Sequence, residues 1–116
     1  MNNTLSEVCS LLLKIQKEFS YVISKNDAKV HEAIFNIQKE CPDMFADLIF
    51  DESGITPFSD ELERILFGLE SGEVLSTPNS EYRKYEIKDV AFLEKKAKDC
   101  NKDMTRALDI FKSVMI

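Results

Sequence analysis

The feature that most constrains the fold of this chain is a change in the spacing of apolar residues within residues 59–87, from helical spacing to strand-like runs. The segment begins with apolar residues at helical spacing and continues with two strand-like runs, residues 74–76 and 82–87. Residues 77–80 between the runs are Thr-Pro-Asn-Ser, which is the composition of a turn. This order predicts a helix from Asp60 to about Ser71, followed by a β-hairpin.

Ser59 and Gly72 are the residues expected to bound this helix. Ser59 can act as the N-cap, because its hydroxyl can accept a hydrogen bond from an unpaired amide of the first turn. Asp60 and Glu61 follow, where the helix dipole favours negative charge. Gly72 tolerates the left-handed conformation in which many helices end, so we expect the helix to stop there.

Both ends of the chain carry apolar stripes with steps of three and four residues, the pattern of a helix with one buried face. Thr4-Leu5-Ser6-Glu7 has the form of a capping box, so we expect a first helix to start there and to end near residues 24–26. A last helix should begin after Asp89, and a break near Asn101 or Asp103 is the alternative. The first stripe contains Leu5, Val8, Leu12, Ile15, Phe19 and Val22.

Asp27 can cap a further helix, which Cys41-Pro42 should end because the proline ring removes a donor and disfavours helical geometry before it. Ile49-Phe50 is a candidate strand. Helix, hairpin, helix is the winged-helix order, so we expect one mainly helical, winged-helix-like domain with a small hairpin. Its expected parts are an N-terminal helix at 1–26, helices and a wing hairpin at 27–87, and a C-terminal helix or helix pair at 88–116.

The length of 116 residues is enough for one domain with an apolar core. Cys9, Cys41 and Cys100 are odd in number and widely spaced, which suits small buried hydrophobes better than a disulfide framework. No apolar run approaches the roughly 20 residues of a membrane-spanning helix, and the start lacks the features of a secretory signal. We therefore expect a cytoplasmic protein that does not enter a membrane.

The charge of the chain argues against nucleic acid as a general partner. The formal net charge is −6 at pH 7, whereas binding to phosphates depends on Lys and Arg. Residues 59–73 carry five carboxylates against Arg64 alone, a local charge of −4. The hairpin adds two basic and two acidic residues and no net charge. We expect a protein partner with a basic or amphipathic surface instead.

Residues that would support catalysis or cofactor binding do not form recognisable motifs. His31 is the only histidine, and a zinc site that combined it with the three cysteines lacks the usual ligand spacing. The three glycines do not form a phosphate-binding loop, and the carboxylates sit on patterned polar faces rather than in a pocket. We expect no enzyme, cofactor or metal, and a surface or capping role for His31.

Two sets of residues are candidates for contacts with other chains. The predicted partner-binding residues lie on the acidic helix and the hairpin; they are Asp60, Glu61, Glu63, Arg64, Glu70, Tyr82, Arg83 and Tyr85. A seam of apolar residues along the last helix predicts a homodimer, because such terminal helices can pair with a second copy. The seam consists of Val90, Leu93, Ala97, Met104, Phe111 and Val114.

Residues 45–75 combine an aromatic strand-like run, the sequence Gly-x-x-Pro-Phe-Ser-x-x-Leu and a helix that ends near a glycine. The pattern resembles the small winged-helix proteins of prokaryotic defence and toxin–antitoxin loci, in particular the middle components of ABC-three-component systems. The resemblance implies an accessory subunit that binds a larger ATPase or effector through its wing hairpin and acidic helix. The matching positions are Phe50, Gly54, Pro57, Phe58, Ser59, Leu62, Leu66, Leu69, Gly72, Val74 and Leu75.

Three functions are compatible with these observations. The favoured one is a non-catalytic module for protein–protein interaction, an adaptor or accessory subunit. The second is a winged-helix transcriptional regulator or antitoxin that contacts DNA through Arg83, Lys84 and the basic cluster of the last helix. The third is an inhibitor whose acidic surface mimics DNA.

Overall fold

The computed structural model describes residues 4–19, 22–24, 27–76 and 84–115. The chain is mainly helical with a small sheet, as the sequence predicted. The helices are α1 (Thr4–Phe19), α2 (Asp27–Glu40), α3 (Asp60–Ser71), α4 (Val90–Ala97) and α5 (Thr105–Met115), and the strands are β1 (Val22–Ser24), β2 (Leu75–Ser76) and β3 (Lys84–Ile87). Within these residues, the structure contains no helix that is long and apolar enough to cross a membrane.

The sheet has the strand order β1-β3-β2, and both pairings are antiparallel. Leu75 lies opposite Ile87 in the β2–β3 pair, which is the hairpin expected from the sequence. Strand β1 was not expected, because the first helix was predicted to continue to residues 24–26 and in fact ends at Phe19. Val22 keeps the helical spacing of the stripe, but the β-branched pair at 22–23 suits a strand, and β3 supplies the backbone partners.

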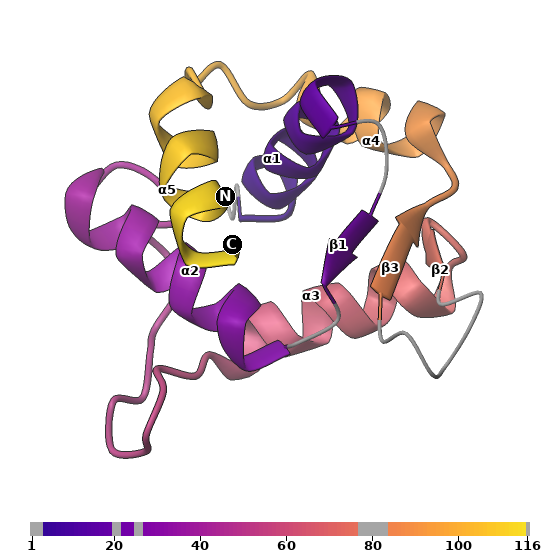
Figure 1. The fold of residues 1–116 in the computed structure, drawn as a ribbon. Coiled ribbons are helices and arrows are strands. Elements are labelled where there is room, and N and C mark those ends of the chain that lie inside the picture. Colours follow the sequence, from indigo (N-terminus) through magenta and orange to yellow (C-terminus); the bar gives the residue numbers. More distant parts are fainter. Residues whose placement is uncertain (1–3, 20–21, 25–26, 77–83, 116) are drawn as a thin grey trace.

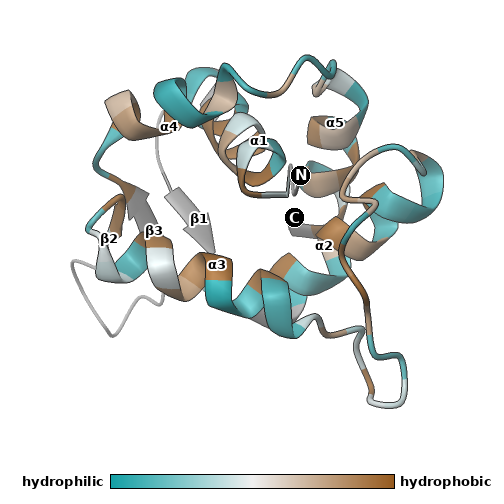
Figure 2. Cartoon of the chain, turned by 180° about the vertical axis from the view of Figure 1, so that it is seen from behind, coloured by the Kyte–Doolittle hydropathy of each residue, from teal (hydrophilic) through white to brown (hydrophobic). Residues whose placement is uncertain are grey.

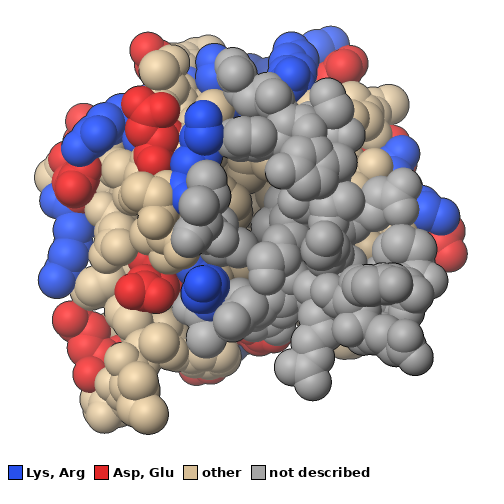
Figure 3. Space-filling view, viewed as in Figure 1, with Lys and Arg blue, Asp and Glu red and all other residues tan. Residues whose placement is uncertain are grey.

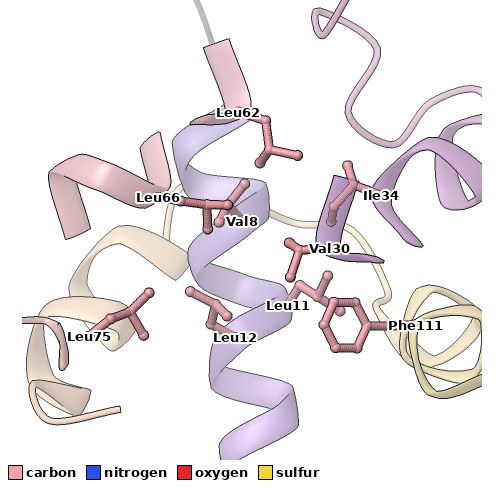
Figure 4. Close-up of a pocket in the computed structure, with 9 residues that line it drawn as sticks. All are labelled: Val8, Leu11, Leu12, Val30, Ile34, Leu62, Leu66, Leu75 and Phe111. Atoms are coloured by element: carbon pink, nitrogen blue, oxygen red, sulfur yellow. The ribbon is translucent and has the colours of Figure 1, made fainter. Parts of the chain in front are cut away.

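Helix α1 packs against α4 and α5, and α5 in turn packs along α2 (Figure 1). The apolar faces of these helices and of α3 meet in one core, and a small cavity of about 20 Å³ lies within it. Only apolar side chains line the cavity, so a water there would find no hydrogen-bond partner. Figure 4 shows these side chains, which are Val8, Leu11, Leu12, Val30, Ile34, Leu62, Leu66, Leu75 and Phe111.

The C-terminal region forms two helices rather than one, which was the alternative left open by the sequence. Asp103 marks the start of the second, because its carboxylate accepts hydrogen bonds from the Thr105 hydroxyl and amide at 2.7 and 2.9 Å. These bonds, the hydroxyl first, lower the pKa of Asp103. Asp89 caps α4 in a similar way by accepting from the Phe92 amide at 3.0 Å.

Helix α3 spans the residues that the sequence predicted, but it ends differently. Ser59 is the N-cap, and its hydroxyl accepts from the Leu62 amide at 3.3 Å. Gly72 has φ −83°, so the expected left-handed glycine is wrong; the left-handed residue is Glu73, with φ 61°. The Glu73 amide donates to Glu70 at 3.1 Å and the Val74 amide to Leu69 at 2.9 Å. This pair of bonds is the Schellman motif, with glutamate in the position that glycine usually takes.

A buried carboxylate holds the chain together after α2. Glu7 of α1 is buried, and its Oε2 accepts from the Phe45 amide at 2.8 Å and from Lys102 Nζ at 3.0 Å. Phe45 is fully buried in a left-handed conformation, with φ 54°. Glu7 thereby connects α1, the turn after α2 and the link between α4 and α5. Its two partners lie 38 and 95 residues further along the chain, so the spacing of residues in α1 could not reveal these contacts.

Candidate functional site

Residues 49–58, here called the arm, project from the body between α2 and α3 (Figure 1). The arm closes on itself, because the Asp51 amide donates to the Phe58 carbonyl at 2.7 Å and the Phe58 amide to the Asp51 carbonyl at 3.0 Å. This single bridge replaces the strand that was predicted at Ile49-Phe50. The Ser53 hydroxyl and amide donate to the Asp51 carboxylate at 2.6 and 2.9 Å and lower its pKa. The arm is therefore a hydrogen-bonded turn with a charged carboxylate at its neck.

Both ends of the arm contact α2 through aromatic rings. Phe50 meets Phe35 edge to face, with ring centroids 5.1 Å apart. Phe58 stacks on His31, with centroids 4.5 Å apart and the planes 13° from parallel. Such ring pairs add to the stabilisation that burial alone provides.

His31 is fully buried, so the predicted surface role is wrong, and the capping role takes an unexpected form. Its Nδ1 accepts the amide hydrogen of Ser59 at 3.0 Å, and its Nε2 lies 2.9 Å from Glu63 Oε2. Because Nδ1 accepts, the proton of the neutral ring is on Nε2 and is donated to Glu63. One histidine of α2 therefore holds the cap residue and the first turn of α3.

The outward face of α3 is formed by its first residue, Asp60, and by the residues three, four and seven positions further along. Asp60, Glu63, Arg64 and Phe67 line an open hollow of about 540 Å³ on this face. The opposite face of the helix is buried in the core through its leucines, Leu62, Leu66 and Leu69. Three of the four residues of the hollow were predicted as partner-binding residues, and Phe67 was missed.

Among the side chains whose exposure the structure describes, the large exposed hydrophobic ones all lie within residues 49–67. Their exposed fractions are 85% for Ile49, 105% for Ile55, 42% for Phe58 and 68% for Phe67. Figure 2 shows hydrophobic positions (brown) on the arm and along α3 beside hydrophilic ones (teal). The exposure of Phe67 could have been predicted from the sequence, because its position on α3 does not share the face of the buried leucines. That of Ile55 could not, because nothing local shows that its loop projects.

Negative charge is concentrated on the same part of the molecule. Residues 43–73 contain nine carboxylates and one arginine, a charge of −8, whereas the other residues contain 12 acidic and 14 basic side chains, a charge of +2. In the view of Figure 3 the projecting arm, at lower left, shows acidic and uncharged atoms. The arm and the outward face of α3 carry four of these carboxylates, Asp51, Glu52, Asp60 and Glu63, together with Arg64. With their exposed apolar side chains they are called the arm–α3 surface below.

The remaining partner-binding candidates lie beside this surface or outside the described residues. Glu61 and Glu70 are half-buried along the sides of α3. Tyr82 and Arg83 fall outside the described residues. Tyr85 lies in β3, where its backbone is opposite Ile23 of β1.

The residues of the predicted dimer seam lie largely within the chain itself. Leu93, Met104 and Phe111 are buried in the core, because α4 and α5 fold back onto α1 and α2. Val90 and Val114 are partly buried against the same core, and Ala97 is also partly exposed. A homodimer stays a prediction. In this fold, the seam side chains left to contact a second copy are the partly buried Val90, Ala97 and Val114.

Among the described residues, no group of three or more His, Cys, Asp or Glu side chains is placed so that it could hold a metal ion. Cys9 is buried, and Cys41 and Cys100 are half-buried. Burial raises the pKa of the Cys9 thiol to about 11, and nearby Lys96 opposes this to a smaller extent.

Comparison of the chain with protein-family models, with curated proteins and with solved structures found no match. The resemblance of residues 45–75 to winged-helix defence proteins therefore stays an interpretation of the sequence.

Proposed function

We propose that this chain is a non-catalytic accessory subunit or adaptor of the cytoplasm that binds a protein partner through the arm–α3 surface. The observation that carries the proposal is the overlap of exposed apolar side chains and excess negative charge on one segment. Contiguous exposed apolar surface on a soluble domain marks an interaction site. Aromatic residues are also enriched at the centres of protein interfaces.

The proposal includes a winged-helix fold. Its support is the element order, α1-β1-α2-α3-β2-β3, together with a three-stranded antiparallel sheet in the order β1-β3-β2. In this arrangement α3 takes the place of the recognition helix, with its leucines inward and its polar side outward. The resemblance to defence-type accessory subunits implies the same kind of role, a small subunit that docks on a larger ATPase or effector.

An inhibitor that mimics DNA is a second candidate, favoured by the charge of −8 over residues 43–73. A helix placed to enter a DNA groove but lined by Asp60 and Glu63 repels phosphates by about 1 kcal/mol per close charge pair. For the same reason a transcriptional regulator is disfavoured at this face. Competition between duplex DNA and the protein for a purified partner separates inhibitor from adaptor, because only an inhibitor is displaced by DNA.

Co-purification from the native host tests the proposed function. The double substitution Asp60→Lys with Phe67→Ser changes two exposed residues of the hollow and should remove the partner. The matched control is Glu94→Lys on α4, an exposed charge reversal away from the surface, which should retain it. Retention of every partner by the double variant, with an unchanged circular dichroism spectrum, contradicts the proposal.

A further inference from the structure

The arm and the outward face of α3 are joined by direct contacts. Phe58 at the base of the arm stacks on His31, and His31 in turn contacts Glu63, which lines the hollow of α3 together with Phe67. The buried His31 therefore links the base of the arm to the hollow of α3, and the exposed residues on either side of it are called the strip below. Asp60 and Phe67, seven residues apart on this strip, are separated by two helical turns, or about 10 Å along the axis.

The strip is held in place before any partner arrives. The arm is closed by the two hydrogen bonds between Asp51 and Phe58, and aromatic contacts fix each end of the arm to α2. Binding to such a surface loses less conformational entropy than binding to a mobile loop. The exposed Ile55 lies within a turn that is closed at its base.

A second copy of the chain does not fit this strip. A two-fold contact places the same patch on both subunits, so it sets four carboxylates and one arginine, a charge of −3, against another patch of the same charge. A head-to-tail contact removes the repulsion, but among the side chains whose exposure the structure describes, none outside residues 49–67 is a large exposed hydrophobic that Ile55 and Phe67 could meet. The occupant is a different protein, with basic and apolar groups side by side.

We propose that the arm–α3 surface is the docking site for a basic amphipathic helix of the partner protein. The apolar stripe of that helix packs on Phe67, Phe58 and Ile55, and its flanking Lys and Arg side chains meet carboxylates such as Asp60 and Glu52. An amphipathic helix carries an apolar stripe flanked by charged side chains, which suits a surface where the exposed Phe67 lies on the same hollow as Asp60. This inference rests on the proposed function and adds the class of partner.

The test uses a synthetic, labelled peptide of about 20 residues, with leucine at helical spacing and lysine elsewhere, so that it forms an amphipathic helix. Fluorescence anisotropy at physiological salt measures its affinity for the full chain. A peptide of the same composition in scrambled order, which has no apolar face, is the reference. The proposal expects the amphipathic peptide to bind about tenfold or more tightly than the scrambled one, a difference of about 1.4 kcal/mol.

Variants locate the bound peptide. Ile55→Ser and Glu52→Lys alter exposed residues of the arm, so folding is retained, and each should weaken binding at least about threefold. Glu94→Lys on α4 makes the same charge change as Glu52→Lys outside the surface and should cause a smaller loss. Equal binding of both peptides, or no effect of Ile55→Ser together with equal effects of the two charge reversals, overturns the inference.

The outcomes also separate this inference from the proposed function. If a partner from the native host depends on Asp60 and Phe67 but the amphipathic peptide does not bind, the protein-binding function stands and the helix-docking mode is wrong. If the peptide binds at the arm but the partner is indifferent to Asp60 and Phe67, the surface recognises basic helices and the proposed route to the partner is wrong.

Discussion

His31 shows how a single residue can connect two helices without a local sequence signal. Its partners Ser59 and Glu63 lie 28 and 32 residues further along the chain, so nothing in the pattern of α2 indicates them. The sequence showed only that His31 is the single histidine of the chain and that the cysteines lack the spacing of zinc ligands around it. It could not show that the ring is buried, because burial here depends on where the arm returns.

Replacing His31 with leucine should destabilise the protein by about 1–3 kcal/mol. The side chain keeps its approximate volume, but the buried amide of Ser59 loses its acceptor, and an unsatisfied buried donor carries a cost of this size. Urea denaturation of His31→Leu measures the loss. Glu63→Gln is the control, because the amide oxygen can still accept from Nε2 and the side chain is part-exposed, so its effect should stay below about 1 kcal/mol. Equal effects of the two substitutions argue against the role given to Nδ1.

Cys9 should resist thiol reagents in the folded protein. Its pKa of about 11 leaves about one thiolate in a thousand at pH 8, and the sulfur is buried. Titration with a chromogenic disulfide at pH 8 should therefore detect Cys41 and Cys100 quickly and Cys9 only after denaturant is added. Rapid reaction of all three thiols without denaturant means that the α1 core opens readily.

At the scale of elements, local signals predicted the helices well and the sheet only in part. Helix α3 was placed from Asp60 to Ser71, because its N-cap, its leucine spacing and its stop are all encoded within a few residues. Strand β1 was missed, because its partner β3 lies about 60 residues away and the short run at 22–24 keeps helical spacing. The arm was also missed, because projection from the body is a property of the packed chain.

The left-handed conformation of Glu73 at the end of α3 can be tested by substitution. Glu73 pays the steric cost of a left-handed residue, so Glu73→Gly should stabilise the protein by about 0.5–1 kcal/mol, despite the greater freedom of glycine in the unfolded chain. Gly72→Ala serves as the comparison, because Gly72 has an ordinary φ of −83° and an added Cβ would lie 3.3 Å from the Gly68 carbonyl oxygen. Thermal unfolding measures both. A stability loss in Glu73→Gly contradicts the left-handed assignment.

For the whole molecule, the decisive property is that negative charge and exposed apolar side chains occur together on one segment. The sequence showed an acidic third helix and a small basic excess outside residues 43–73, and the structure adds the arm and Phe67 to the outward face of that helix. The same folding covers much of the apolar seam that had suggested a homodimer, since Leu93, Met104 and Phe111 complete the core. The surface left for a partner is therefore the one that the charge pattern first indicated, enlarged by residues that only the fold brings together.

Hydrogen exchange on the complex isolated from the native host tests this account most directly. Amides of residues 49–67 should exchange more slowly in the complex than in the free protein, because the partner covers the arm and the outward face of α3. Amides of α4 and α5 should exchange at unchanged rates. Protection confined to α4 and α5, with residues 49–67 unaffected, would contradict the central claim that the arm–α3 surface binds the partner.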